Sequence, residues 1–405
     1  MKDLKKDFRF FDKGEIYLDS AATAQTPEAV INAMADFDRT ERAPIYKGVY
    51  PSSEQATARY EQIRQQIADW FSVSPNGVIF TSGATEAINL VMHSWAMVNL
   101  KAGDEILISP IEHHANLVPW QVVAQKTGAI LKFIDFDLNT RLLGLKESDF
   151  TSKTKLVCVT AESNVLGQVW QPGDLQKLIE LAHSVGARVL IDAAQAAAHC
   201  RHNLTQLGAD FFVVSAHKMM GPVGLGILCI KEDVYPEMEP YQYGGSMVSS
   251  VQLTNSQWQR PPQMFEAGSA FSTQVIGLGA LLTYFKSIDR SALIQHEQNL
   301  IRSIIKIIDS IEGSEILGNR QYAENGGHLV SFIIDGVHPH DVASLLGMQG
   351  IAVRAGNHCA QPLHQLLGMN ASLRVSVHCY TTQADVNAFG VALHEVVEQL
   401  REYSR

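Results

Sequence analysis

The strongest constraint on the fold is an alternation of short apolar runs and helical patterns between residues 78 and 230. Runs rich in β-branched and other apolar residues stand at 78–81, 105–109, 156–160, 187–192 and 211–215. Between them, residues 86–97 and 173–185 carry apolar side chains at helical spacing. This alternation predicts an α/β fold in which helices cover a mostly parallel sheet.

A smaller α+β unit is expected after this segment. Residues 235–268 are rich in Pro, Gly, Gln and Ser and are too long for an ordinary connection, so we expect a functional or interface loop there. Helical patterns follow at 276–287 and 292–311. Further strands and helices are predicted at 328–334, 339–348, 351–354, 373–377 and 383–402.

Composition narrows the class of function. The chain has 405 residues, of which 46% are hydrophobic and 18% charged, so it is a folded globular protein. A net charge of -10 disfavours nucleic acid and anionic membranes as partners. The basic first ten residues precede no apolar signal segment, and no run approaches the roughly 18 apolar residues of a membrane span. We therefore expect a cytosolic protein that acts on a small molecule.

Polar residues follow several of the predicted strands, at the edge where parallel α/β sheets bind ligands. Gly83, Ala84 and Thr85 open a helix after the first run and offer backbone N–H groups to a phosphate, although many such turns bind nothing. His113 and His114 follow the second run. Adjacent histidines point in different directions on a helix and no third ligand stands at metal spacing, so we expect no metal site. Stacking of a ring on a flat cofactor is the alternative.

Lys218 is the decisive residue, because it lies in the segment 215–222, which begins where the apolar run at 211–215 ends. A charged lysine is costly to bury, and the cost is removed when its amine forms a Schiff base with an aldehyde. Asp192, the last residue of the run at 187–192, either caps the next helix or pairs with a buried cationic nitrogen. A lysine, an acid and a phosphate cradle at one edge predict a pyridoxal 5'-phosphate site. A solvated loop lysine is the other interpretation.

The second unit contributes a candidate nucleophile. Cys359 stands near a predicted helix start, between Arg354 and His358 on one side and a Pro-containing turn on the other, so its thiol pKa could be depressed. Cys158 and Cys229 lie inside apolar strands and are expected in the core, and Cys200 and Cys379 receive no role. Arg374 interrupts an apolar run, which suggests a bound carboxylate or a structural salt bridge.

In this order, the segments resemble the group II cysteine desulfurases of the SufS and CsdA type. The most specific motifs are EHHANLVPWQ at 112–121, SNVLG at 163–167, residues 215–222, FEAG at 265–268 and VRAGNHCAQPL at 353–363. The resemblance runs from residue 17 to the closing helix. It implies the fold-type I pyridoxal-phosphate transferase fold, with a seven-stranded sheet in a large domain (17–288) and a small C-terminal domain (289–405). The N-terminal segment (1–16) would pack with the small domain.

The resemblance also implies roles for individual residues. Lys218 would hold the cofactor, Asp192 would pair with its pyridinium nitrogen, Gln195 would contact its phenolic oxygen, and His113 would stack on its ring. Cys359 would form the persulfide. The phosphate would contact Gly83, Ala84, Thr85, Ser215, His217 and, from the neighbouring subunit of a homodimer, Ser269, whereas Asn164, Arg374 and Arg354 would hold the substrate.

The implied activity is conversion of L-cysteine to L-alanine. The sulfur would pass to a small acceptor protein of the SufE or CsdE type, for iron-sulfur clusters or other sulfur-containing cofactors. A selenocysteine lyase or a cysteine sulfinate desulfinase on the same fold is the alternative. A cofactor-free scaffold would be expected to lack Lys218 or Asp192, and both are present.

Several positions depart from the usual family pattern. They are Tyr50, Ala84, Met220, Ser269 and the pair Ala161 and Glu162, which precedes Ser163 where His-Val is typical. Backbone contacts to a cofactor survive such changes. Substrate preference and the choice of acceptor are the properties that these departures leave open.

Overall fold

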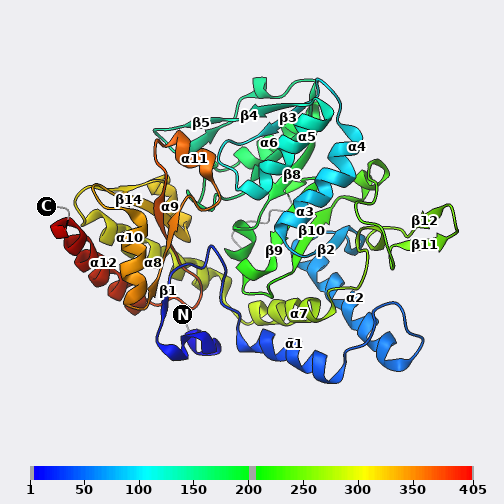
Figure 1. Ribbon diagram of the computed structural model, residues 1–405, viewed down its shortest axis with the longest axis horizontal. Coiled ribbons are helices and arrows are strands. Elements are labelled where there is room, and N and C mark those ends of the chain that lie inside the picture. Colours follow the sequence, from blue (N-terminus) through cyan, green and yellow to red (C-terminus); the bar gives the residue numbers. More distant parts are fainter. Residues whose placement is uncertain (1–3, 200–206, 404–405) are drawn as a thin grey trace.

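A seven-stranded sheet forms the centre of the protein (Figure 1). The computed structural model describes residues 4–199 and 207–403, so Cys200 lies outside the described residues. The strands are β2 (Val78–Thr81), β3 (Glu105–Ile108), β4 (Ile130–Phe133), β7 (Thr154–Thr160), β8 (Arg188–Asp192), β9 (Phe211–Ser215) and β10 (Gly226–Ile230). Their order is β2-β10-β9-β8-β7-β3-β4. β10 is antiparallel to both neighbours, and the remaining neighbours are parallel. The predicted mostly parallel α/β sheet is confirmed.

Helices cover both faces of this sheet, which explains why its strands are apolar rather than alternating. In β2, Val78 and Phe80 belong to one hydrophobic cluster and Ile79 to the cluster on the opposite face. The covering helices are α1 (Glu28–Thr40), α2 (Pro51–Phe71), α3 (Ala84–Val91), α4 (Met97–Asn99), α5 (Val118–Thr127), α6 (Asp174–Ser184) and α7 (Ser272–Lys286).

A second sheet of four antiparallel strands is built by the C-terminal part of the chain. Its order is β13-β14-β17-β16, and it packs against helices in a hydrophobic cluster of its own (Figure 1). The elements are β13 (Ser314–Ile316), β14 (Leu329–Ile334), β16 (Arg354–Gly356), β17 (Ser372–Ser376), α8 (Arg290–Asp309), α9 (Arg320–Gly326), α10 (Pro339–Met348), α11 (Gln361–Leu366) and α12 (Gln383–Tyr403).

The N-terminal residues pack against this C-terminal part. Strand β1 (Ile16–Tyr17) pairs in parallel with β15 (Ile351–Ala352). The ring of Phe8 lies 4.9 Å from that of Tyr380, between centroids. Lys5 donates a hydrogen bond of 2.7 Å to Asp385 in α12. The start of the chain therefore lies beside α12 and β15 and not on the central sheet.

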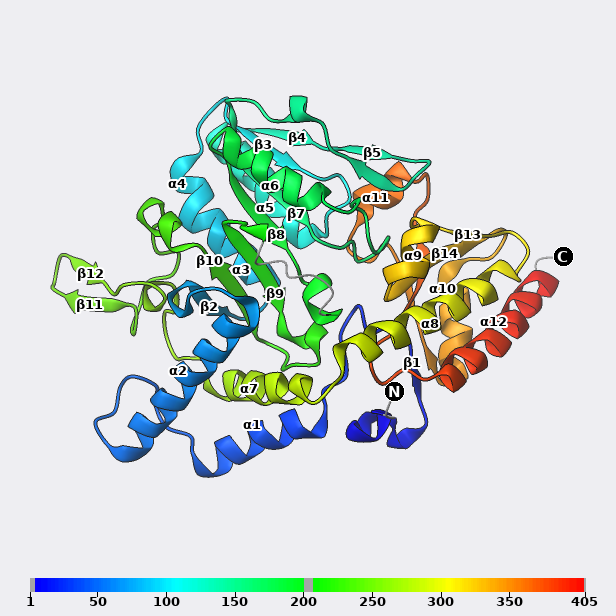
Figure 2. The ribbon, with the colours of Figure 1, turned by 180° about the vertical axis from the view of Figure 1, so that it is seen from behind.

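Three sequence predictions need correction. Residues 351–354 do not form one strand, because β15 pairs with β1 whereas β16 joins the four-stranded sheet. Residues 235–268 are not a plain loop, since they contain the hairpin β11 (Val248–Val251) and β12 (Ser256–Trp258), which projects from the molecule in Figures 1 and 2. The helix expected at 86–97 is interrupted by a π-helical turn, Met92–Ala96.

A further small hairpin joins β5 (Asp135–Asp137) and β6 (Leu142–Gly144).

A buried ion pair fixes the segment that precedes Ser269. Arg64 of α2 donates hydrogen bonds of 2.8 and 2.9 Å to the two carboxylate oxygens of Glu266. Arg64 also donates to the carbonyl of Val78, and Glu266 accepts from the backbone N–H of Phe80. The guanidinium is only 1% exposed, so this pair clamps the FEAG segment to the edge strand β2.

We expect Glu266→Gln to lower the free energy of unfolding by about 3 kcal/mol, because it leaves the buried guanidinium of Arg64 with only the partly exposed carboxylate of Glu61. The urea midpoint of unfolding measures this. Asp36→Asn is the matched control, because Asp36 pairs with Arg39 on the surface with side chains 69% and 71% exposed. Its loss should be within about 0.5 kcal/mol. Equal losses in the two variants would contradict the role of the buried pair.

Candidate active site

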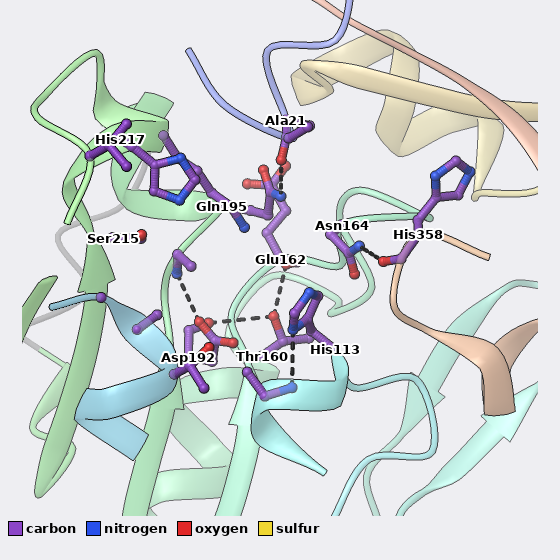
Figure 3. Close-up of a pocket in the computed structure, with 18 of the residues that line it drawn as sticks. Ala21, His113, Thr160, Glu162, Asn164, Asp192, Gln195, Ser215, His217 and His358 are labelled. Carbon is purple, nitrogen blue, oxygen red and sulfur yellow. Dashed lines mark hydrogen bonds between the residues drawn. The ribbon is translucent and has the colours of Figure 1, made fainter. Parts of the chain in front are cut away.

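A pocket of about 370 Å³ lies at the carboxyl ends of the parallel strands (Figure 3). It brings together most of the site residues predicted from the sequence, from both sheets. These are Gly83, Ala84, Thr85, His113, Asn164, Asp192, Gln195, Ser215, His217, Lys218, Arg354 and Arg374. Cys359 does not line the pocket itself, and Ser269 is exposed outside it.

Lys218 lies in the short turn Ala216–Met219 that follows β9. Burial is the largest influence on its amine and lowers the pKa to about 8, although Asp192 opposes this shift. Arg374 and Arg354 lower it further. A substantial neutral fraction near neutral pH is what a lysine needs in order to attack an aldehyde.

Asp192 is the last residue of β8 and is 5% exposed. Its Oδ1 accepts a hydrogen bond of 2.9 Å from the backbone N–H of Ala194, which precedes the short helix Ala196–His199, so this bond does not cap the helix. The residue also lines the pocket, and burial raises the pKa of its carboxyl above the ordinary value. A buried cationic nitrogen would reverse that shift.

The two adjacent histidines differ in position and in hydrogen-bond partners, and only His113 lines the pocket. His113 Nδ1 accepts from the backbone N–H of Ala115 at 3.1 Å, so neutral His113 carries its proton on Nε2. Burial, followed by the charge of Lys218, lowers its pKa to about 3, which keeps the ring neutral. His114 is not among the residues that line the pocket and binds the segment around Cys359 instead.

A phosphate cradle is offered by the start of α3. Gly83, Ala84 and Thr85 line the pocket at the helix N-terminus, where the first N–H groups have no partner within the helix. A Cβ on Gly83 would meet no atom within 4 Å. Ser215, at the end of β9, and His217 border the same side of the pocket. His217 Nδ1 lies 3.0 Å from Thr23 Oγ1.

The opposite side of the pocket is cationic. Arg374 in β17 is 1% exposed and donates to Asp19 Oδ1 and to the carbonyl of Asn164, each at 2.9 Å. Its Nε is buried and has no hydrogen-bond partner among the described residues. Arg354 stands opposite Arg374 in the β16–β17 register. Arg374 therefore forms a structural salt bridge with Asp19, and its Nε–H remains available to bind the carboxylate of a ligand.

Two hydrogen bonds of His114 hold the segment from Cys359 to Gln361. The carbonyl of Cys359 accepts from the N–H of His114 at 2.8 Å, and the N–H of Gln361 donates to His114 Nε2 at 3.2 Å. His358 and Cys359 both have positive φ, 52° and 59°, which is strained for side chains of this size. This strained turn immediately precedes α11.

The expected electrostatic contribution of His358 to the Cys359 thiol is not present. His358 is 3% exposed, and burial lowers its pKa to about 2, so the ring is uncharged. Among the described cysteines, Cys158, Cys229 and Cys379 are buried, and burial raises the pKa of each thiol. Cys359 is the one described cysteine that is partly exposed.

Sequence reasoning did not assign several residues of the pocket. Thr160 ends β7, and its hydroxyl donates to the carbonyl of Glu162 at 2.8 Å. Glu162 itself lines the pocket and is 4% exposed. Its position next to Ser163, as a departure from the family pattern, was the available signal. Asp19, the partner of Arg374, carried no signal because 355 residues separate the pair.

The residues present fit pyridoxal phosphate. A partly buried lysine with a lowered pKa, a buried carboxylate and a helix N-terminus meet in one pocket. In residues 4–199 and 207–403 no cluster of three His, Cys, Asp or Glu side chains could hold a metal ion. The helices of the same residues include none with the length and apolarity needed to cross a membrane.

Comparisons with known proteins extend over almost the whole chain. A model of the family described as Aminotransferase class-V matches residues 16–389. A probable cysteine desulfurase of Halalkalibacterium halodurans is 40% identical over 95% of this chain and 93% of its own. The apo structure of cysteine desulfurase from Thermococcus onnurineus has a TM-score of 0.91 and 35% identity, covering 98% of both chains. The cysteine desulfurase CsdA of Escherichia coli has a TM-score of 0.90 and 34% identity, also over 98% of both.

The lowered pKa of Lys218 gives the cofactor-free protein a defined pH dependence. Below pH 8 the lysine is protonated in both states, and burial of its charge costs the folded state about 3 kcal/mol. As the pH rises from 8 to the ordinary value of 10.5, the folded state releases its proton first and this cost disappears. We expect Lys218→Met to be more stable than wild type at pH 7 and to lose this advantage by pH 10.5.

Urea unfolding of the cofactor-free proteins across this pH range measures the difference. Lys126→Met is the matched control because Lys126 is exposed in the last turn of α5. A stability difference for Lys218→Met that does not change with pH would mean that the amine is not desolvated.

Proposed function

The chain belongs to the class-V aminotransferase family, and we propose that it is a pyridoxal-phosphate-dependent cysteine desulfurase. It converts L-cysteine to L-alanine and leaves the sulfur as a persulfide on Cys359. The observation that carries this proposal is a partly buried lysine and a buried carboxylate at one sheet edge, with a partly exposed cysteine in the segment that His114 binds.

Lys218, Asp192 and the start of α3 would hold the cofactor. When bound, pyridoxal phosphate withdraws electrons from the substrate Cα. Asp192 keeps a cationic nitrogen protonated, because a buried carboxylate stabilises a neighbouring positive charge. The N-terminus of α3 binds the phosphate, with Ser215 and His217 beside it. Neutral His113 suits a ring that stacks on an aromatic cofactor.

The substrate binds on the side of the pocket that carries the two arginines. Arg374 holds the carboxylate of L-cysteine with its remaining donor, and Asn164 and Arg354 line the same side. Asp19 and the carbonyl of Asn164 fix the guanidinium plane, so its orientation is set before the substrate arrives. This placement directs the Cα of the substrate toward Lys218, whose Nζ accepts the Cα proton as a general base.

The sulfur step conserves all atoms. Cys359 Sγ attacks the sulfur of L-cysteine, a sulfur–sulfur bond forms, and the bond between that sulfur and the substrate Cβ breaks. The products are alanine and the Cys359 persulfide, with the thiol protons retained on alanine and on the terminal sulfur, so no oxidant is needed. The strained turn connects His358, which lines the pocket, to the partly exposed Cys359.

We further propose a homodimer in which exposed Ser269 contacts the phosphate in the partner subunit. The persulfide sulfur would pass to a small acceptor of the SufE or CsdE type, for iron-sulfur clusters or other sulfur-containing cofactors. The described cysteines are free thiols, which suits the reducing cytosol. We also propose that the chain consists of a large domain (17–288) and a small domain (289–405), and that the N-terminal segment (1–16) packs with the small domain.

Alanine release from L-cysteine, with a thiol reductant present, tests the proposed function. Wild type should produce alanine, and Cys359→Ala should lose at least about 100-fold of this activity, because the nucleophile is absent. Cys379→Ala is the matched control, since Cys379 is 2% exposed and packs on Met220. It should keep its activity if it folds.

Parallel assays with selenocysteine and cysteine sulfinate separate the related activities. A preference for either substrate, with Cys359 dispensable, would replace the desulfurase proposal by that lyase or desulfinase. No alanine from any of the three substrates would contradict all of them.

A further inference from the structure

Beside the pocket lies a buried group of imidazole and carboxylate side chains. His328 immediately precedes β14 and is fully buried. Its Nδ1 lies 3.0 Å from a carboxylate oxygen of Glu162, and its Nε2 lies 3.3 Å from Gln195 Oε1. The ring stacks on that of His199 at 3.8 Å between centroids, and His199 in turn contacts Glu297. His328 therefore joins the C-terminal sheet to a pocket residue.

The orientation of the Gln195 amide follows from its two neighbours. Its Nε2 lies 2.9 Å from the carbonyl oxygen of Ala21, which can only accept, so this atom must be the amide nitrogen (Figure 3). The amide oxygen then faces His328 and needs a donor there. One N–H of Gln195 remains, and the residue lines the pocket.

His328 must therefore carry a proton on Nε2. Its other nitrogen faces the Glu162 carboxylate, and these two atoms require a second proton between them. The pair thus contains an imidazolium and a carboxylate, or their neutral equivalents, with no net charge in either case. The Glu162 carboxylate stabilises the protonated form of His328, in which Nε2 donates to Gln195. The negative charge of the carboxylate balances the positive charge of the ring.

We propose that His328, paired with Glu162, is a positioning residue that holds the Gln195 amide with its N–H toward the pocket. This rests on the proposed function, in which the group that faces Gln195 is the anionic phenolic oxygen of pyridoxal phosphate. An N–H donor stabilises such an oxygen anion, whereas a rotated amide would present its carbonyl and repel it. The carbonyl of Ala21 and the N–H of His328 select the same orientation from the two ends of the amide, so without His328 only the Ala21 contact opposes the rotation.

The test uses His328→Phe in the cofactor-loaded enzyme. Phenylalanine keeps a ring against His199 but has no N–H for Gln195. We expect the pH midpoint of the absorbance change of the bound cofactor to rise by about one unit, because the oxygen anion loses a donor. The dissociation constant for pyridoxal phosphate should rise roughly tenfold for the same reason. His328→Gln is the matched control, because its amide can donate to Gln195, and both values should stay near those of wild type.

Gln195→Leu should reproduce the His328→Phe shift, and the double variant should shift no further than either single variant. If His328→Phe does not fold, His328→Leu takes its place. An unchanged midpoint and dissociation constant in the folded variant, or equal shifts in His328→Phe and His328→Gln, would overturn the positioning role. These readouts require cofactor binding but no turnover, so a wild type that binds pyridoxal phosphate without releasing alanine would contradict the proposed function alone.

Discussion

The desolvated, partly buried ammonium of Lys218 is the constraint on which the rest of the site depends. It sits where β9 ends, in a pocket that removes most of its water, and its pKa falls accordingly. Asp192 opposes this fall, whereas the nearby arginines of the C-terminal sheet increase it. A lysine in this setting is destabilising unless its charge is removed by chemistry, which is what a Schiff base with an aldehyde cofactor does.

Contacts between the two sheets complete the pocket. Arg374 of β17 binds the carbonyl of Asn164, and the amide of Asn164 binds the carbonyl of His358 at 2.6 Å. His114 binds the Cys359 segment, and His328 contacts Gln195. Each contact joins the C-terminal sheet to a loop at the edge of the central sheet. The geometry of the substrate side therefore depends on how the two sheets dock.

The edge residues were predictable because of a local rule. A side chain at the end of an apolar strand or a few residues after it lies at the carboxyl edge, and this rule placed Lys218, Asp192 and Thr85 in one pocket. The same rule cannot find contacts between distant segments, such as that of Asp19 with Arg374. It also failed where short apolar runs can pair with either of two partners, which is why residues 351–354 divide between two sheets. The sequence also could not give the charge of His358, because burial in the folded protein keeps its ring neutral beside the cysteine.

The central claim is that Cys359 receives the sulfur of the substrate. Mass spectrometry of proteolytic peptides, after mixing the loaded enzyme with L-cysteine in the absence of reductant, measures this directly. The account expects one added sulfur atom on the peptide that contains Cys359, and none on the peptides of the buried thiols Cys158, Cys229 and Cys379. Alanine formed together with an unmodified Cys359 peptide, or with sulfur on another cysteine, would contradict it.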